Sequence, residues 1–364
     1  MSLKHKIALS MISGIGSINA KKLIAFFGDA EHIFKAKKAD LIKVQGIGAF
    51  LANEILNKSV LDNAEKEMVF LEKNGIKSYF LLDKEYPERL KHCEDSPIIM
   101  YFKGNANLNK QKIISIVGTR NATQYGKEHC NELVKNLQIN GHNPLIVSGL
   151  AYGIDICAHK AALKNNLSTI AVLGHGLRTL YPASHKKFAR EIIDSGGLLT
   201  EFPGKAKLDP SNFVKRNRII AGMADATIVV ESGAKGGSLI TADIANSYNR
   251  DVFAFPGRVN DKQSIGCNRL IKTNRAALIE NINDLEYMLG WEKHKKQAIQ
   301  KQLFIELSAD EQIVVDALKA EENLSIDIIC LKTNFPMSKV SSILLKLEFS
   351  GLVKSFPGKI YKLD

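Results

Sequence analysis

The stretch Ile113-Ile-Ser-Ile-Val-Gly-Thr-Arg120 decides the fold, because an apolar run of strand length ends directly in a glycine. The same pattern recurs at Val147-Ser-Gly149 and at Leu173-Gly-His-Gly176. Short apolar runs that alternate with helical patterns predict a parallel sheet with helices on both faces, which is an α/β fold. The glycine turns then lie at the carboxyl ends of the strands, where open α/β sheets bind their ligands.

This α/β core is expected from about residue 75 to 285. Its predicted strands are Ile113–Val117, Leu145–Val147, Thr169–Leu173, Leu198–Glu201, Ala226–Val230 and Val252–Ala254. Its helices are expected to begin near Tyr125, Ile154, Ser184, Asn212 and Ser238. The dinucleotide fingerprint is absent, because Thr179 stands where its third glycine belongs, and Gly233-Ala-Lys-Gly-Gly-Ser238 lacks the ending of a Walker A loop. We therefore expect an anion site without a nucleotide cofactor.

One predicted helix, Phe213-Val-Lys-Arg-Asn-Arg-Ile-Ile-Ala-Gly-Met223, carries cations within an amphipathic pattern. Arg216 falls inside the apolar arc, whereas the other two cations fall on the next face. An unpaired buried charge is strongly unfavourable, so Arg216 either pairs with a carboxylate or lines a pocket that an anion enters. Glu201 and Glu231 are the carboxylates considered for such a pair. Both interpretations stay open at this point.

Composition restricts the class of protein. A chain of 364 residues is longer than one core usually organises, so two or three domains are expected. Fifty Lys and Arg against 38 Asp and Glu give a net charge of +12, which favours a polyanionic partner. The five cysteines form no C-x-x-C pair, so we expect neither a metal site nor a disulfide framework. Without a signal core or a long apolar run, a cytoplasmic protein with no membrane contact is expected.

Residues 1–65 contain an internal duplication. The two copies are Ile12-Ser-Gly-Ile-Gly-Ser17 and Val44-Gln-Gly-Ile-Gly-Ala49, each followed by an amphipathic helical pattern. They resemble tandem helix-hairpin-helix or SAM-like helical domains, in which the glycine turn either exposes backbone N–H groups to a phosphate or simply joins two helices. The α/β domain follows at 66–291, and the Lys- and Gln-rich stretch 292–302 predicts a solvated linker.

Residues 303–364 predict a small domain of their own. Helical patterns at Ala309–Ala320, Ser325–Thr333 and Ser338–Ser350 precede a hairpin pattern at 351–362, and this order resembles a winged helix. The expected recognition helix carries only Lys339 and Lys346 as cations. Binding of duplex DNA, binding of a protein and a purely structural role therefore stay open for this domain.

Five segments in order resemble the DNA-processing protein A family, also called DprA or Smf, over nearly the whole chain. The segments are Ile116-Val-Gly-Thr-Arg120, Val147-Ser-Gly-Leu-Ala-Tyr-Gly-Ile-Asp155 with His159, Phe213–Ile220, Gly236-Gly-Ser-Leu-Ile-Thr-Ala242 and Phe253-Ala-Phe-Pro-Gly257. The resemblance implies an extended Rossmann-like, homodimeric domain that binds single-stranded DNA. It also implies protection of incoming strands during natural transformation and loading of a RecA-type recombinase.

Carried over residue by residue, the resemblance implies a DNA pocket on the turns and the cationic helix. Its residues would be Gly118, Thr119, Arg120, Ser148, Gly149, Phe213, Lys215, Arg216, Asn217, Arg218, Gly236, Gly237 and Ser238. Contacts to phosphates predict binding that is nearly independent of base sequence and strongly dependent on salt. Phe213 is placed either to stack on a base or to pack in the core. In a departure from many relatives, Arg275 adds a cation where they carry a Gly-Ala pair.

Two other functions are compatible with the sequence. Rossmann-like phosphoribohydrolases use a P-G-G-x-G-T motif followed by catalytic glutamates, and Gly236-Gly-Ser-Leu-Ile-Thr-Ala-Asp243 keeps the glycines without those glutamates. Asp155 and His159 are spaced as an acid–base pair, although Asp155 also suits the first turn of a helix. A winged-helix regulator would instead prefer a specific duplex. We expect a DNA-binding protein that is not an enzyme and needs no cofactor.

Overall fold

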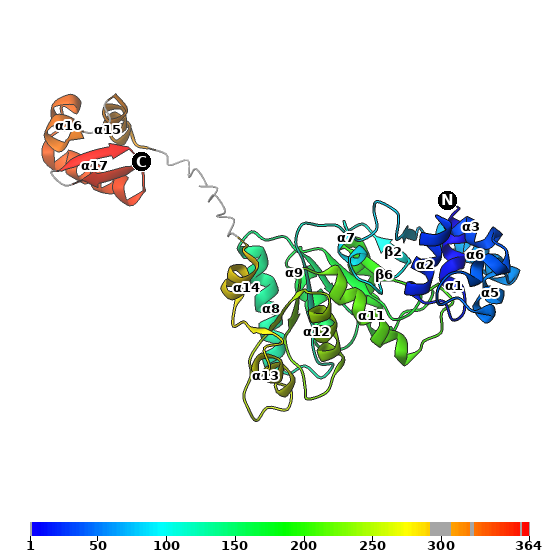
Figure 1. Ribbon diagram of the computed structural model, residues 1–364. Coiled ribbons are helices and arrows are strands. Elements are labelled where there is room, and N and C mark those ends of the chain that lie inside the picture. Colours follow the sequence, from blue (N-terminus) through cyan, green and yellow to red (C-terminus); the bar gives the residue numbers. More distant parts are fainter. Residues whose placement is uncertain (1, 292–306, 321–323, 357–358, 364) are drawn as a thin grey trace. The chain divides into compact units, whose positions relative to one another are not determined.

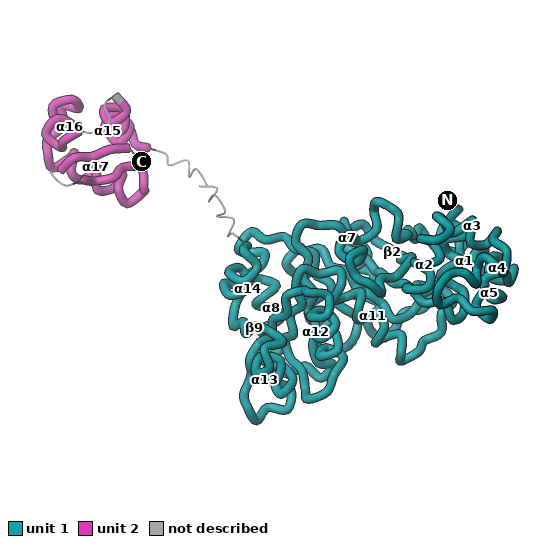
Figure 2. The backbone as a smooth tube through the Cα atoms, viewed as in Figure 1, with its two compact units in different colours: residues 1–296 teal, residues 297–364 magenta. Residues whose placement is uncertain are grey.

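The computed structural model describes residues 2–291, 307–320, 324–356 and 359–363. The chain divides into two compact units, residues 1–296 and 297–364, shown in different colours in Figure 2. The linker predicted at 292–302 lies outside the described residues. Within the described part of the chain, every helix is too short or too polar to span a bilayer.

Residues 3–73 fold into a helical region of the first unit. Its helices are α1 (Leu3–Met11), α2 (Ser17–Phe27), α3 (Ala30–Lys35), α4 (Lys38–Ile42), α5 (Ala49–Ile55) and α6 (Lys58–Lys73). The boundary predicted after residue 65 falls within α6. The apolar core of this region continues into the adjoining sheet, because Leu71 of α6 clusters with Phe80 and Tyr101.

The duplicated glycine turns pack against each other's helices. Gly14 and Gly46 adopt positive φ angles of 79° and 96°, which side chains rarely take. A Cβ atom on Gly14 would lie 2.9 Å from Leu51, and one on Gly46 would lie 2.8 Å from Asn19. Asn19 and Leu51 each stand five residues after the equivalent glycine, so the two copies meet in a reciprocal arrangement.

A nine-stranded sheet forms the centre of the first unit (Figure 1). Its strands are β1 (Lys77–Phe80), β2 (Ile99–Gly104), β3 (Ile113–Val117), β4 (Leu145–Ser148), β5 (Thr169–Val172), β6 (Gly197–Thr200), β7 (Ala226–Val229), β8 (Asp251–Ala254) and β9 (Ala277–Leu278). The order is β1-β2-β6-β5-β4-β3-β7-β8-β9, and strands β6 through β9 in this order are parallel, whereas β2 and β1 join antiparallel. All six predicted strands are confirmed to within one residue at each end. Strands β1, β2 and β9 were not predicted.

Helices cover both faces of the sheet, as predicted. One face carries α8 (Gln124–Ile139), α9 (Ile154–Lys164), α10 (Lys186–Ser195) and α14 (Ile282–Leu289), and the other carries α7 (Glu88–Lys91), α11 (Pro210–Met223), α12 (Gly237–Ser247) and α13 (Ile265–Lys272). The side chains of β3 explain why both faces are covered. Ile113 and Val117 pack in the core on one face, and Ile114 and Ile116 pack in the core on the other. The five expected helix starts lie within two residues of those observed.

The strand order changes direction at β3, although the strands on both sides of it are parallel. From β3 the chain passes through α8 to β4 on one side, and it returns from β6 through α11 to β7 on the other side of β3. The connections after β3 and β7 therefore leave the sheet toward opposite faces. Such a switch point opens a crevice at the carboxyl ends of the two strands.

The second unit, considered by itself, is a winged helix, as predicted. It comprises α15 (Ala309–Ala320), β10 (Leu324–Ser325), α16 (Ile326–Thr333), α17 (Met337–Phe349), β11 (Val353–Phe356) and β12 (Ile360–Leu363). The three strands pair antiparallel in the order β10-β12-β11. Residues 357–358, within the hairpin predicted at 351–362, lie outside the described residues. Both cations of α17 are ion-paired, Lys339 to Asp310 at 2.9 Å and Lys346 to Glu311 at 2.6 Å.

Candidate nucleic-acid interface

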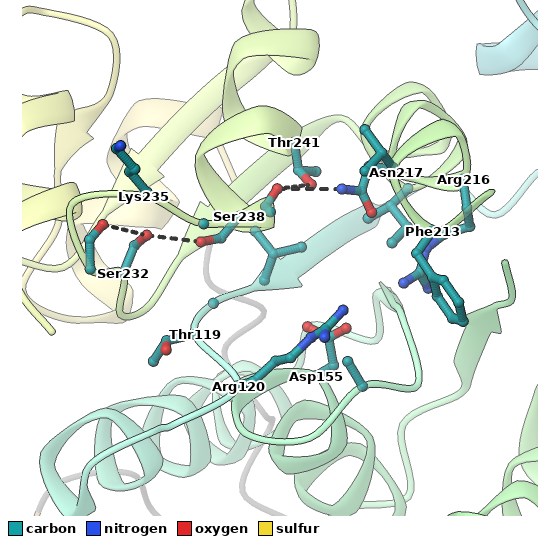
Figure 3. A pocket seen from close by; sticks show the side chains of 18 residues that line it. Thr119, Arg120, Asp155, Phe213, Arg216, Asn217, Ser232, Lys235, Ser238 and Thr241 are labelled. Atoms are coloured by element: carbon teal, nitrogen blue, oxygen red, sulfur yellow. Dashed lines mark hydrogen bonds between the residues drawn. The ribbon is translucent and has the colours of Figure 1, made fainter. Parts of the chain in front are cut away.

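A pocket of about 350 Å³ lies at the switch point, between the turns that follow β3 and β7 (Figure 3). We call it the crevice. Four parts of the chain form its walls: the turn after β3, the β4–α9 turn with the start of α9, the helix α11, and the turn that leads into α12. The structure brings together in it the predicted residues Gly118, Thr119, Arg120, Phe213, Arg216, Asn217, Gly236, Gly237 and Ser238.

Helix α11 reaches the crevice because its start is well defined. Pro210 occupies the first turn, and the side chain of Asp209 accepts a hydrogen bond from the backbone N–H of Ser211 at 2.7 Å. The helix then crosses the carboxyl edge of the sheet. Its inward side presents Phe213 and Arg216 to the crevice, while Ile219 packs in the core below.

Arg216 is buried at the wall of the crevice, with 5% of its surface exposed. Its Nη1 atom donates to the carbonyl oxygen of Val172, and its Nε atom has no hydrogen-bond partner. Among the described residues no carboxylate lies within the 4.0 Å of an ion pair with this guanidinium. Burial lowers the pKa of Arg216, and the charge of Asp155 opposes that effect.

Neither carboxylate considered as a partner for Arg216 pairs with it. Glu201 binds Arg218 instead, with 2.6 Å between Oε2 and Nη2. Glu231 accepts hydrogen bonds from Thr123, at 2.5 Å from its Oγ1 and 2.9 Å from its backbone N–H. The structural ion pair proposed for Arg216 with these residues is therefore wrong. The structure places the guanidinium at the crevice wall, and its binding of an anion stays a prediction.

Gly149 supports the crevice from below, and Ser148 belongs to the sheet. A Cβ atom on Gly149 would lie 2.4 Å from Nη1 of Arg216 and 2.4 Å from Oδ2 of Asp155, so only glycine leaves room for both charged groups. The Oγ of Ser148 is buried and donates to the carbonyl oxygen of Ile116 at 2.6 Å. These two predicted residues therefore lie behind the crevice wall without lining it.

Asp155 lines the crevice, and His159 lies beneath it. Burial raises the pKa of the Asp155 carboxyl, and the neighbouring charge of Arg216 opposes the shift. His159 is completely buried, with Nε2 2.5 Å from the carbonyl oxygen of Gly149 and Nδ1 2.7 Å from Oγ1 of Thr169. Burial lowers the pKa of His159 to about 4. Both ring nitrogens thus face protein atoms, which supports a structural role for this histidine.

The turn before α12 supplies hydroxyl groups and backbone N–H groups to the crevice. Thr241 Oγ1 donates to the carbonyl oxygen of Gly237 at 3.0 Å, and Ser238 Oγ donates to Ser232 Oγ at 3.0 Å (Figure 3). The first N–H groups of a helix have no partner within it, and the helix dipole makes this end attractive to anions. The start of α12 is therefore suited to hold a phosphate.

Sequence reasoning missed Lys235, which lies at the end of the crevice opposite Phe213 and Arg216 (Figure 3). It stands inside the Gly233–Ser238 segment, in which Gly236, Gly237 and Ser238 are predicted DNA-binding residues. Its place in a glycine turn directly before a helix was the available signal. With Lys235, the crevice contains three cations against the single carboxylate of Asp155.

Lys215 and Arg218 lie on another side of α11. Both line a separate cavity of about 660 Å³ between α11 and the start of α2. There Arg218 pairs with Glu201 and lies 3.6 Å from Asp95. The structure therefore does not bring Arg218 together with Arg120, and the role of Lys215 and Arg218 in DNA binding stays a prediction. Arg275 pairs with Asp243 and does not line the crevice.

Comparison with known proteins identifies the family. The model of the family "DNA recombination-mediator protein A" matches residues 77–290, which include the whole crevice. The chain belongs to the DNA recombination-mediator protein A family. A second model, the DprA winged helix domain, matches residues 301–359. Among curated DprA and Smf proteins, Protein Smf of Synechocystis sp. is 32% identical, over 98% of this chain and 97% of its own.

DprA proteins of known structure share the fold. The X-ray structure of DNA processing protein A from Streptococcus pneumoniae has a TM-score of 0.66 and 31% identity, and the match covers 78% of this chain and 97% of that one. A DprA structure from Helicobacter pylori, described for its single-stranded DNA binding mode, has a TM-score of 0.54 and 30% identity, covering 60% of this chain and 97% of that one. Membership in the DprA family thus agrees with the resemblance seen in the sequence.

Proposed function

We propose that the crevice binds the phosphodiester backbone of single-stranded DNA. The observation that carries this proposal is Arg216, a buried guanidinium without an ion-pair partner among the described residues, in a pocket that also contains Arg120 and Lys235. The charge of Asp155 acts on Arg216 without a direct ion pair, and a bound phosphate supplies a counter-charge in direct contact. Binding of an anionic ligand therefore offsets the free energy that burial of the Arg216 charge costs in the free protein.

The rest of the crevice favours a phosphate over a carboxylic acid or a base edge. Backbone N–H groups at the start of α12 and the glycines of the adjoining turns suit phosphate oxygens. Phosphate contacts fix the position of a strand without reading its sequence. A pocket of about 350 Å³ is large enough for one nucleotide unit. The single-stranded DNA binding described for the Helicobacter pylori relative supports the same ligand here.

On this basis the protein acts as a recombination mediator. It holds incoming single strands during natural transformation, protects them, and delivers them to a RecA-type recombinase. We further propose that it works in the cytoplasm as a homodimer. Asp243, the first acid after the Gly236-Gly237 turn, pairs with Arg275 and does not line the crevice.

The winged helix gives little support to a regulator that binds duplex DNA. Lys339 and Lys346, the two cations of α17, both pair with acids of α15. The other exposed residues of α17, which include Ser341, Leu345 and Phe349, carry no positive charge. We therefore assign DNA binding to the first unit.

Fluorescence anisotropy with labelled single-stranded and duplex oligonucleotides across a salt series tests this function. We expect wild type to prefer the single strand and Arg216→Met to lose at least tenfold in affinity. Lys164→Ala is the matched control, because Lys164 is an exposed cation at the far end of α9. Equal binding of duplex, or full affinity in a folded Arg216→Met variant, would refute the proposal. Strand-exchange assays with a RecA-type recombinase test the mediator role separately.

A further inference from the structure

A narrow slot continues the crevice along the carboxyl edge of the sheet. It shares Arg120, Ala151, Phe213 and Arg216 with the crevice and has a volume of about 30 Å³. Figure 3 shows Phe213 and Arg216 at the end of the crevice away from Lys235, so the slot extends from that end. A volume this small holds about one water molecule, and a base can only lie on its rim.

Two tyrosines line this slot, and each leaves 49% of its surface exposed. Tyr152 comes from the turn between β4 and α9, and Tyr181 comes from the connection between β5 and α10. Aromatic side chains of this size are usually more deeply buried in a monomer. Their exposure beside a cationic pocket therefore suggests a ligand with flat, apolar faces.

Both rings are held in place by neighbouring groups. The ring of Tyr181 meets Phe213 edge to face at 5.7 Å between centroids, and its backbone N–H donates to Nε2 of His175 at 3.2 Å. The hydroxyl of Tyr152 lies 3.0 Å from Oγ of Ser184, and its ring is 4.8 Å from that of His185. Because these contacts already restrict the rings, a ligand that stacks on them loses little side-chain entropy.

We propose that Tyr181 and Tyr152 form a base-stacking rim for the strand whose phosphate occupies the crevice. This inference rests on the proposed function of the crevice. Phosphates and bases alternate along a single strand, and the rim lies directly beside the guanidinium groups of Arg120 and Arg216. Stacking accepts every base, since each has a π-face, so the rim adds affinity without sequence preference.

Strands with and without bases distinguish stacking from phosphate binding. We would compare a labelled thymidine oligonucleotide with an abasic strand that has the same number of phosphates, by anisotropy at one salt concentration. Tyr181→Ala should bind the thymidine strand roughly five- to a hundredfold more weakly than wild type does, which is the range for one stacked base. Its affinity for the abasic strand should change less than twofold. Tyr181→Phe should retain wild-type affinity for both strands.

The matched control is Tyr287→Ala, since Tyr287 of α14 is 87% exposed and lines neither pocket. Equal losses on both strands, or no loss on the thymidine strand, would overturn the proposed rim. If Tyr181→Ala fails to fold, ultraviolet crosslinking of wild type to the thymidine strand decides the question. Mass spectrometry should then place the adduct on a peptide containing Tyr181 or Tyr152, and adducts elsewhere alone would count against the rim. Failure of the crevice itself would look different, because Arg216→Met would then leave binding of both strands intact.

Discussion

The Nη1 atom of Arg216 donates a hydrogen bond to the carbonyl oxygen of Val172, the last residue of β5. This bond attaches the middle of α11 to the carboxyl edge of the sheet. It fixes the guanidinium at the wall of the crevice, while Nε has no partner in the protein. In the proposed function, Arg216 is thus held in place before the ligand arrives, which lowers the entropic cost of binding.

Replacing Arg216 should affect binding far more than folding. Arg216→Met removes a buried charge that has no ion pair among the described residues, so we expect the free energy of unfolding to change by no more than about 1 kcal/mol. Affinity for single-stranded DNA should fall at least tenfold. Urea unfolding and anisotropy measure the two effects. A structural ion pair would instead show itself as a loss of several kcal/mol in stability.

Gly149→Ala should displace the same guanidinium indirectly. The new Cβ atom would stand 2.4 Å from Nη1 of Arg216, so the side chain must move away from its position at the crevice wall. We expect a stability loss of about 1–3 kcal/mol, typical of overpacking, together with weaker DNA binding. Gly48→Ala is the control, because a Cβ atom there meets nothing within 4 Å. If Gly149→Ala binds DNA like wild type, the position of Arg216 is unimportant for binding.

Lys235 should contribute one phosphate contact. For single strands the logarithm of the affinity falls with the logarithm of salt concentration by about 0.7 for each phosphate neutralised. Lys235→Ala should therefore reduce the magnitude of that slope by about 0.7 and weaken binding equally for all base sequences. Affinities measured at several salt concentrations for thymidine and adenosine strands test this. An unchanged slope would place Lys235 away from the strand.

Arg218→Met should reveal whether Arg218 supports the fold or contacts DNA. The substitution leaves the largely buried carboxylate of Glu201 without its cation, and the loss of stability should be on the order of 3 kcal/mol. Binding of single-stranded DNA should change less than threefold. The double variant Glu201→Gln/Arg218→Met should recover part of the stability, since it removes the isolated carboxylate. A tenfold loss of affinity at unchanged stability would instead place Arg218 on the path of the DNA.

His159 should make the protein less stable in mild acid. Its pKa of about 4 in the folded protein lies below the ordinary value near 6.5, so the unfolded chain takes up the proton first as the pH falls. Its contribution is thus complete above pH 6.5 and declines as the pH falls to 4, by on the order of 3 kcal/mol. Urea unfolding of wild type and His159→Gln at pH 7.5 and 5 should show a smaller pH effect in the variant. Equal pH effects in both proteins would contradict the neutral, buried imidazole.

Most strands and helices of the α/β core could be predicted from the sequence, because the patterns that mark them span only a few neighbouring residues. A run such as Ile113–Val117 has both faces buried, so it is apolar throughout, and the glycine that ends it marks the carboxyl edge. β1 gave a weaker signal, since Lys77–Phe80 is a short edge strand with an exposed cation. β2 has the apolar composition of a strand, but it joins the sheet antiparallel, outside the alternation of strands and helices that guided the prediction.

Charge partners could not be predicted in the same way. Arg216 and Arg218 are two residues apart on one helix, and helical geometry correctly separated their faces. The path of the loop that carries Glu201 decides which face of α11 this carboxylate meets. In the structure, Glu201 pairs with Arg218. For Lys235 the difficulty was different. The sequence predicts the glycine turn, but the lysine within it belongs to no known motif.

The position of the crevice between β3 and β7 also has a consequence for synthesis on the ribosome. These neighbouring strands lie far apart in the chain, and β7 enters the sheet only after β4, β5 and β6 have been made. A nascent chain that ends at Thr200 already contains Arg120 but has neither Arg216 nor Lys235. Domains acquire contacts between distant segments late in folding, and the amino-terminal helices are complete long before. The residues that line the crevice are therefore complete only when α12 has been synthesised, after β3 to β7 and before β8 and β9.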